Sequence, residues 1–133
     1  MATRTQARTA VVQSLYAFDA GNDDVVKQFN DYLLERKIKG QKAEFAKSLF
    51  DGVLEHLEEI DKKIGENIND WSVDRLDKID KAILRLGVYE ELFTDLPFQV
   101  VINESIEIAK LLSEEKSGRF INGVLDRIAK GKE

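Results

Sequence analysis

The sequence contains no cysteine, one proline, one histidine and no long hydrophobic run. Without cysteine there is no disulfide framework and no thiolate metal site, and nothing indicates an oxidising compartment. The opening residues lack a signal-peptide stretch, and no segment approaches the roughly 18 uninterrupted apolar residues of a membrane span. We therefore expect a soluble cytoplasmic protein that does not contact membranes.

Chemical motifs are also scarce. His56 is the only histidine, and no second histidine or cysteine lies at metal-ligand spacing from it. No nucleophile elbow, phosphate-binding loop or zinc-protease signature occurs, and scattered acidic residues on amphipathic helices ordinarily form a solvated face. We expect neither a metal nor a cofactor, and no catalysis.

The remaining composition is that of an ordered globular protein. Of 133 residues, 43% are hydrophobic and 34% are charged, which is enough for one domain with its own core. The net charge of −5 disfavours non-specific nucleic acid binding, which depends on lysine and arginine. Any nucleic-acid contact must therefore be local.

Apolar residues recur every three or four positions along nearly the whole chain, which is the period of amphipathic helices. The pattern predicts an all-α fold of six or seven helices, in two packed three-helix bundles over about 1–68 and 72–131. The predicted helices cover about 4–20, 24–38, a long third segment through 46–64, then 77–94, 97–112, and a last helix that Ser117 caps.

Several of these helices have predicted buried positions. The second helix is expected to bury Val26, Phe29 and Leu33. The helix that begins at Asp77 is apolar around most of its circumference, so it should be the buried centre of the second half. Gly123 lies inside the last helix, where close packing against another helix would explain a glycine.

Tyr16 lies away from the apolar stripe of the first helix and should be exposed or interfacial. Arg8, Val12 and Tyr16 are spaced four residues apart, so they are expected to share one side of that helix. A guanidinium can bind phosphate while a phenol ring stacks on an unpaired base. The alternative is that Tyr16 packs against another helix.

The start of the last helix is the second candidate site. It offers free amide groups, positive charge, an aromatic ring and a base-reading amide, which together can attract phosphate and nucleobases. The alternatives are that Phe120 packs in the core and that Ser117 only caps the helix. The residues concerned are Lys116, Ser117, Gly118, Arg119, Phe120 and Asn122.

The final third of the chain carries two distinctive blocks, PFQVVINESIEIAK at 97–110 and SGRFINGVLD at 117–126. Together with Trp71 and the run ILRLGVYE at 83–90, they resemble the NusB family of bacterial transcription antitermination factors. The resemblance covers nearly the full chain, with specific C-terminal blocks and a weaker N-terminal one.

The resemblance implies a two-bundle helical fold and a partnership with NusE, a small-subunit ribosomal protein. It also implies that the pair binds single-stranded boxA RNA in nascent transcripts such as ribosomal RNA and joins an antitermination complex on RNA polymerase. Carried over by position, the implied RNA-binding residues are Arg4, Arg8, Tyr16, Lys116, Arg119, Phe120 and Asn122. The implied partner-binding residues are Asp80 and Leu84.

One departure from the family concerns the N-terminus, where relatives often carry a denser arginine cluster than Arg4 and Arg8. We therefore expect weak RNA affinity for the protein alone and much stronger binding by the pair. The alternative function is a helical protein–protein adaptor without RNA contact. An RNA-modifying enzyme is the least favoured interpretation, because we expect no nucleotide-binding α/β domain. The sequence leaves open whether the free protein is a monomer or a homodimer.

Overall fold

The computed structural model describes residues 2–68 and 72–132, so Trp71 lies outside the described part of the chain. Within those ranges there are seven α-helices, one short 3-10 helix and no strand, as the periodicity predicts. The elements are α1 (Arg4–Asp19), α2 (Asp24–Glu35), α3 (Gly40–Glu55), α4 (Leu57–Glu66), η1 (Val73–Arg75), α5 (Lys78–Phe93), α6 (Phe98–Leu112) and α7 (Glu115–Lys132).

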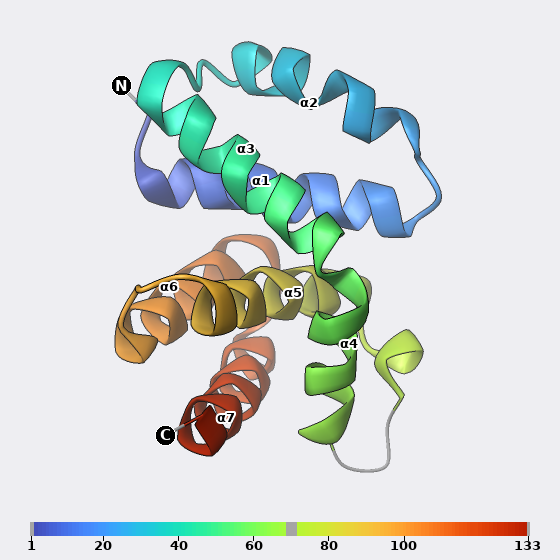
Figure 1. The fold of residues 1–133 in the computed structure, drawn as a ribbon, viewed down its shortest axis with the longest axis vertical. Helices are drawn as coiled ribbons and strands as arrows, with labels where there is room; N and C mark the ends of the chain where they lie inside the picture. Colours follow the sequence, from blue (N-terminus) through green and yellow to red (C-terminus); the bar gives the residue numbers. More distant parts are fainter. Residues whose placement is uncertain (1, 69–71, 133) are drawn as a thin grey trace.

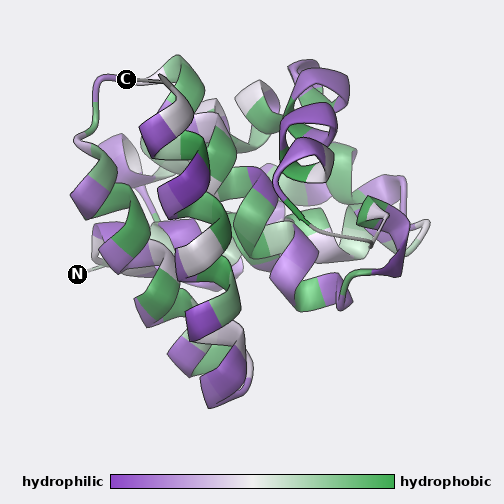
Figure 2. Cartoon of the chain, turned by 90° about the horizontal axis from the view of Figure 1, so that it is seen from below, coloured by the Kyte–Doolittle hydropathy of each residue, from purple (hydrophilic) through white to green (hydrophobic). Residues whose placement is uncertain are grey.

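The helices form two bundles that share one core (Figure 1). Helices α1, α2 and α3 make the first bundle, and α5 lies at the centre of the second, packed against α4, α6 and α7. Helix α1 packs on α3 and on α5, so it is covered from both bundles. The view from below shows hydrophobic residues on the faces that the helices turn towards one another (Figure 2). None of the described helices is long and apolar enough to cross a membrane.

Local sequence signals account for several helix ends. Thr3 and Gln6 form a capping box at the start of α1, and Gly21 adopts a φ of +96° just after its end. The Asp77 carboxylate accepts hydrogen bonds from the amides of Ile79 and Asp80 at 3.0 and 3.1 Å. These signals lie within a residue or two of the predicted helix starts and stops, so the predicted ends of α1 and the start of α5 are confirmed.

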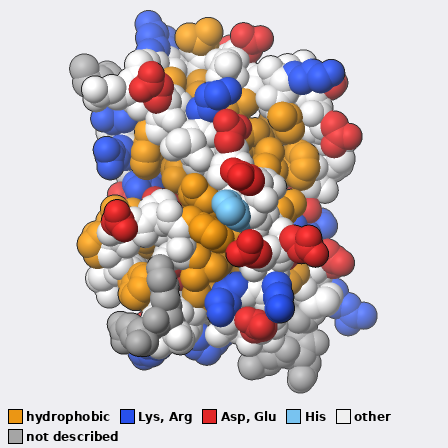
Figure 3. All heavy atoms as spheres, viewed as in Figure 1, with side chains coloured by type: hydrophobic (Ala, Val, Ile, Leu, Met, Phe, Trp, Pro, Cys, Tyr) orange, Lys and Arg blue, Asp and Glu red, His pale blue; other side chains and the backbone are white. Residues whose placement is uncertain are grey.

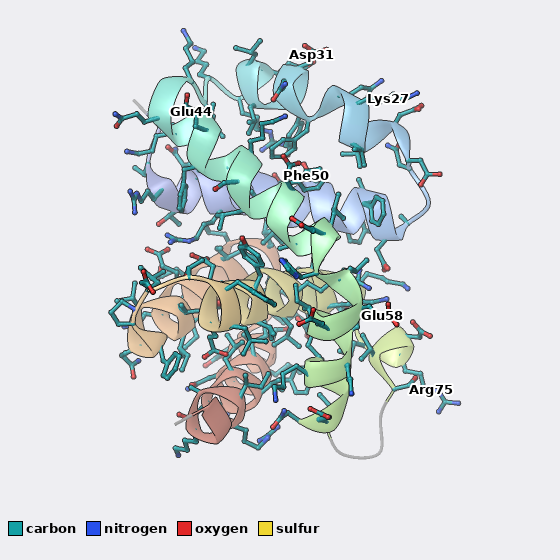
Figure 4. All side chains as sticks on the ribbon, viewed as in Figure 1. Lys27, Asp31, Glu44, Phe50, Glu58 and Arg75 are labelled. Atoms are coloured by element: carbon teal, nitrogen blue, oxygen red, sulfur yellow. The ribbon has the colours of Figure 1, made fainter. Side chains whose placement is uncertain are left out.

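The core of the first bundle contains one aromatic pair. Phe50 points from α3 towards α1 and α2 (Figure 4), and its ring stacks on that of Phe29 in α2 at 4.3 Å between centroids. The expectation that Val26 is buried is wrong: Val26 is 45% exposed and Val25 is buried instead. A one-residue difference rotates a helical position by about 100°, and periodicity alone did not resolve it.

The predicted long third helix is wrong in one respect, because it is two helices. At His56 the backbone leaves helical geometry, with φ −108° and ψ 21°, although its amide still donates to the Gly52 carbonyl at 3.1 Å. The chain changes direction there (Figure 1), so that α3 packs on α1 while α4 packs on α5 and α7. The apolar stripe continues through the bend because both helices bury apolar residues. The residues of α3 face the first bundle and those of α4 face the second. The second bundle therefore begins at α4.

Close helix contacts occur at two glycines in the described chain. A Cβ at Gly52 would overlap the ring of Tyr89, and one at Gly87 would lie 3.0 Å from a methyl group of Leu125. The expected close packing at Gly123 is not found, because only the Arg127 guanidinium approaches that position, at 3.5 Å.

Candidate nucleic-acid interface

Arg8 does not lie on an exposed side of α1. Its Nε and one terminal nitrogen donate to the two carboxylate oxygens of Glu90 at 2.9 and 3.0 Å, and Glu104 approaches it at 3.8 Å. Arg8 is 3% exposed and Val12 is 0% exposed, because this side of α1 packs against the second bundle. The expectation that Arg8, Val12 and Tyr16 share a solvent-facing surface is therefore wrong, and the guanidinium of Arg8 has carboxylates where phosphate would have to bind.

Arg4 and Tyr16 remain at the surface, at opposite ends of α1. The Arg4 guanidinium lies over the Phe45 ring, 4.8 Å from its centroid, and Tyr16 is 41% exposed. At 1.5 Å per residue, the two are about 18 Å apart along the helix axis. They therefore form two separate surfaces.

The Tyr16 end of α1 is tied to the start of α5 by an ion network. Asp19, one turn beyond Tyr16, lies 3.1 Å from Lys81 and 3.2 Å from Arg85. Burial raises the pKa of the Asp19 carboxyl, but hydrogen bonding and charge from Lys81, with Arg85, outweigh it, and the pKa is lowered below 3.8. A largely buried ion network thus joins this end of α1 to the start of α5.

A cavity of about 390 Å³ opens between the starts of α5 and α7. It brings together one residue expected to contact a protein partner and two expected to contact RNA, namely Asp80, Lys116 and Phe120. The remaining lining residues are Arg75, Leu76, Asp77 and Ser117. We call this cavity the α5–α7 pocket.

Asp80 is the unusual member of the pocket. It is 8% exposed, and its Oδ1 has no hydrogen-bond partner in the described part of the chain. Burial raises the pKa of the Asp80 carboxyl above 3.8, hydrogen bonding by Ser117 opposes the rise, and the charge of Asp77 adds to it. A buried acceptor without a donor destabilises the folded state by about 1–3 kcal/mol.

Leu84, the other expected partner-binding residue, is 0% exposed. It lies one turn after Asp80 on the helix that both bundles cover, so its side chain contributes to the core and offers no contact surface. The expectation that Leu84 shares an exposed face with Asp80 is therefore wrong.

The expected residues on α7 divide between two sides of the helix. The helix begins at Glu115, so Ser117 lies within its first turn instead of capping it, and its hydroxyl lies 2.9 Å from that of Ser113. Phe120 is half-buried and lines the α5–α7 pocket. Arg119 and Asn122 line a second cavity of about 210 Å³, beside Ile106 and Lys110 in α6.

The remaining titratable candidate, His56, takes part in aromatic packing. Its ring stacks on Phe93 at 4.1 Å between centroids, and its Nδ1 lies 3.9 Å from the Glu59 carboxylate. Within 2–68 and 72–132, no group of three His, Cys, Asp or Glu side chains could hold a metal ion.

Fold and site together define a two-bundle helical protein whose candidate site is a binding surface, formed where the starts of α5 and α7 meet. The sequence profile described as the NusB family matches residues 5–130. The chain belongs to the NusB family.

Known proteins agree with this assignment. The chain is 52% identical over 130 residues to the transcription antitermination protein NusB of a Nitratiruptor species, covering 98% of this chain and 94% of that protein. Its fold is similar to a solved structure of T. maritima NusB, with a TM-score of 0.84, 37% identity and coverage of 97% and 92%. It is also similar to a chain in the crystal structure of antitermination factors NusB and NusE in complex with dsRNA, with a TM-score of 0.87, 34% identity and 96% coverage of each chain.

Proposed function

We propose that this chain is a transcription antitermination factor that binds single-stranded RNA and performs no chemical step. The observation that carries the proposal is the α5–α7 pocket. A half-buried aromatic ring, an exposed lysine and a buried carboxylate oxygen without a donor in the described chain converge there from two helices. The exposed Tyr16 lies one turn before Asp19, whose carboxylate pairs with Lys81, the residue that follows Asp80.

These groups suit an unpaired nucleotide. Phe120 can stack on a base, the Asp80 carboxylate that lines the pocket can accept an N–H from the base edge, and Lys116 can neutralise a phosphate. Stacking of one base on an aromatic side chain is worth about 1–3 kcal/mol. Tyr16 provides a second ring on which a neighbouring base can stack, so the strand would run from α7 across the start of α5 to the end of α1.

We propose that the RNA is a boxA-type element of nascent transcripts such as ribosomal RNA, and that NusE is the protein partner. Support comes from family membership and from the fold's similarity to a NusB chain solved with NusE and dsRNA. The same proposal places the pair in the antitermination complex of RNA polymerase. Of the two residues expected at the partner contact, Asp80 is buried but lines the pocket, whereas Leu84 is in the core.

Charge explains why a partner would be needed. The chain carries a net charge of −5, and one of the two N-terminal arginines is occupied by carboxylates. A partner that supplied cations to the same strand would raise affinity through effective concentration, without any new contact from this chain.

The test is a titration of a boxA-type RNA and a scrambled RNA with this protein, with NusE, and with both. We expect the pair to bind the boxA-type RNA far more tightly than either protein alone, and more tightly than it binds the scrambled RNA. Equal binding of the two RNAs by the pair would contradict the proposal.

The alternative is a helical adaptor that contacts only proteins, which the burial of Arg8 and the net negative charge favour. Salt dependence discriminates the two functions. RNA binding through phosphates weakens steeply as salt rises, whereas a mainly apolar protein interface changes little. A pair that binds NusE but shows no salt-dependent RNA binding would be an adaptor.

A further inference from the structure

The densest basic stretch of the chain lies outside the α5–α7 pocket. Residues 36–42 (RKIKGQK) carry four basic residues and no acidic one, across the connection between α2 and α3. The structure places them around a cavity of about 590 Å³. Its lining residues are Ala2, Lys37, Lys39, Gly40, Gln41 and Lys42.

The backbone fixes these lysines at the surface. After α2 the amide of Ile38 donates to the Leu33 carbonyl at 2.9 Å and that of Lys37 to the Leu34 carbonyl at 3.0 Å, which is a Schellman motif. Lys37 takes the left-handed position, with φ 60°. Ile38 is 2% exposed and anchors the connection in the core, so the lysines on either side of it are held outward.

These lysines are free to bind an anion. In residues 2–68 and 72–132, none of Lys37, Lys39 and Lys42 lies within ion-pair distance of a carboxylate, whereas Lys63, Lys110 and Lys130 each pair with an acidic neighbour on their own helix. The amides in the first turn of α3 receive no side-chain cap, which adds to the positive potential of the cavity.

The cluster is continuous with the N-terminus of α1. The Arg4 guanidinium lies over the ring of Phe45, which is one turn beyond Lys42 on α3. Ala2, two residues before Arg4, also lines the cavity that Lys37, Lys39 and Lys42 surround. We call Arg4 and these three lysines the cationic strip. Blue side chains gather at the upper left end of the molecule, over the starts of α1 and α3 (Figure 3).

We propose that the cationic strip is a second RNA contact, which binds backbone phosphates outside the α5–α7 pocket; this inference rests on the proposed function. Lysines on flexible stems neutralise phosphates without reading bases, and the lysines of the strip carry no ring or amide to recognise a base. Arg4 stands about 18 Å along α1 from Tyr16, so only a strand of several nucleotides could contact both surfaces. Because Arg8 is buried and paired with Glu90, it cannot contact phosphate. The strip provides positive charge at the surface instead.

The test compares two RNAs, a boxA-type strand of about 12 nucleotides and a fragment of about 5 nucleotides that can occupy the pocket alone. The variant is Lys37→Gln/Lys39→Gln/Lys42→Gln, bound to NusE as the wild-type protein is. Lys37→Gly is a second variant, because glycine favours the left-handed position and the turn is kept. Lys27→Gln is the matched control, since Lys27 is an exposed lysine at the far end of α2 (Figure 4).

We expect the triple variant to bind the long RNA about tenfold more weakly and to lower the slope of log affinity against log salt by about 2, from three phosphate contacts of about 0.7 each. Lys37→Gly should give a smaller loss in the same direction. Binding of the short fragment, and all binding by Lys27→Gln, should match the wild type.

Three outcomes would overturn the inference. If wild type binds both RNAs but the triple variant keeps its affinity and salt slope for the long one, the strip does not contact RNA and the proposed function stands. If the triple variant loses NusE binding in the absence of RNA, the strip binds an acidic protein surface instead. If wild type with NusE binds neither RNA, the proposed function itself fails, and the inference fails with it.

Discussion

Arg8 of α1 and Glu90 of α5 form a buried, two-point ion pair that joins the two bundles of the molecule. The residues are 82 positions apart in sequence. Glu104 lies 3.8 Å from the same guanidinium and extends the contact to α6. An arginine expected to bind RNA is therefore part of the interior. Arg8 stabilises the fold, and only the cations at the surface are available to a ligand.

Arg8→Ala should destabilise the protein by about 3–5 kcal/mol, because it leaves the Glu90 carboxylate buried without its partner. Arg4→Ala, which removes a cation at the surface from over an aromatic ring, should change the free energy of unfolding by no more than about 1 kcal/mol. Urea unfolding of both variants measures the difference. A fully stable Arg8→Ala variant with weakened RNA binding would show that Arg8 contacts RNA.

Tyr16→Ala should weaken boxA-type RNA binding by about 1–3 kcal/mol, or about 5- to 150-fold, with little effect on folding because the ring is exposed. Tyr16→Phe keeps the stacking face and should bind nearly as the wild type does. Fluorescence anisotropy with NusE present provides the measurement. Equal affinities for Tyr16→Ala and wild type would remove Tyr16 from the site.

Phe120→Leu tests whether the half-buried ring acts in packing or in stacking. Leucine keeps most of the apolar contact with the core, so we expect the free energy of unfolding to fall by less than about 1.5 kcal/mol. RNA affinity should nevertheless drop by about 1–3 kcal/mol, because leucine has no ring to stack on a base. A stability loss accompanied by unchanged RNA affinity would assign Phe120 to the core.

Asp80→Asn should stabilise the protein at neutral pH and weaken RNA binding. Burial raises the folded-state pKa of Asp80 above 3.8, so its contribution to stability is fully present below about pH 3.8 and is lost as pH rises through the raised pKa. The variant's advantage in the free energy of unfolding should therefore grow with pH and reach about 1 kcal/mol at neutral pH. Urea unfolding across this range measures it, and an advantage that shrank with rising pH would contradict the assignment.

Gly52→Ala and Gly123→Ala should change stability in opposite directions, although both glycines lie inside helices. The Cβ at Gly52 would overlap the Tyr89 ring, so we expect a loss of about 1–3 kcal/mol. Gly123 has room for a methyl group, and its replacement should gain up to about 1 kcal/mol from helix propensity. Thermal unfolding of the two variants compares them, and a destabilised Gly123→Ala would mean that this position is packed after all.

Local signals made the fold predictable. A few adjacent residues determine three of the helix ends, at the Asp77 cap, at Pro97 and at Gly21. The apolar circumference of α5 identified the central helix. The bend at His56 was not predictable in this way, because the stripe keeps its spacing through it. Its position depends on contacts of α4 with α5 and α7, which are distant in sequence.

The candidate site was predictable only in part, for the same reason. Tyr16 could be placed at the surface from its own helix, but the partners of Arg8 come from α5 and α6. Asp80 and Phe120 were assigned separately to protein and RNA contacts, and only the packing of α7 on α5 shows that they line one pocket. The basic run at 36–42 was visible in the sequence, but its continuity with Arg4 depends on the position of Phe45.

The ion network around Asp19 and Arg85 has a consequence for assembly. Arg85 donates to Asp61 of α4 at 2.9 and 2.8 Å and to Asp19 of α1 at 3.2 Å, so three helices from both bundles are cross-braced at one guanidinium. These ion pairs hold the helices in place, so the groups that line the α5–α7 pocket have fixed separations before a ligand binds. If the proposed function holds, RNA binding would then require ordering of the RNA and little change in the protein.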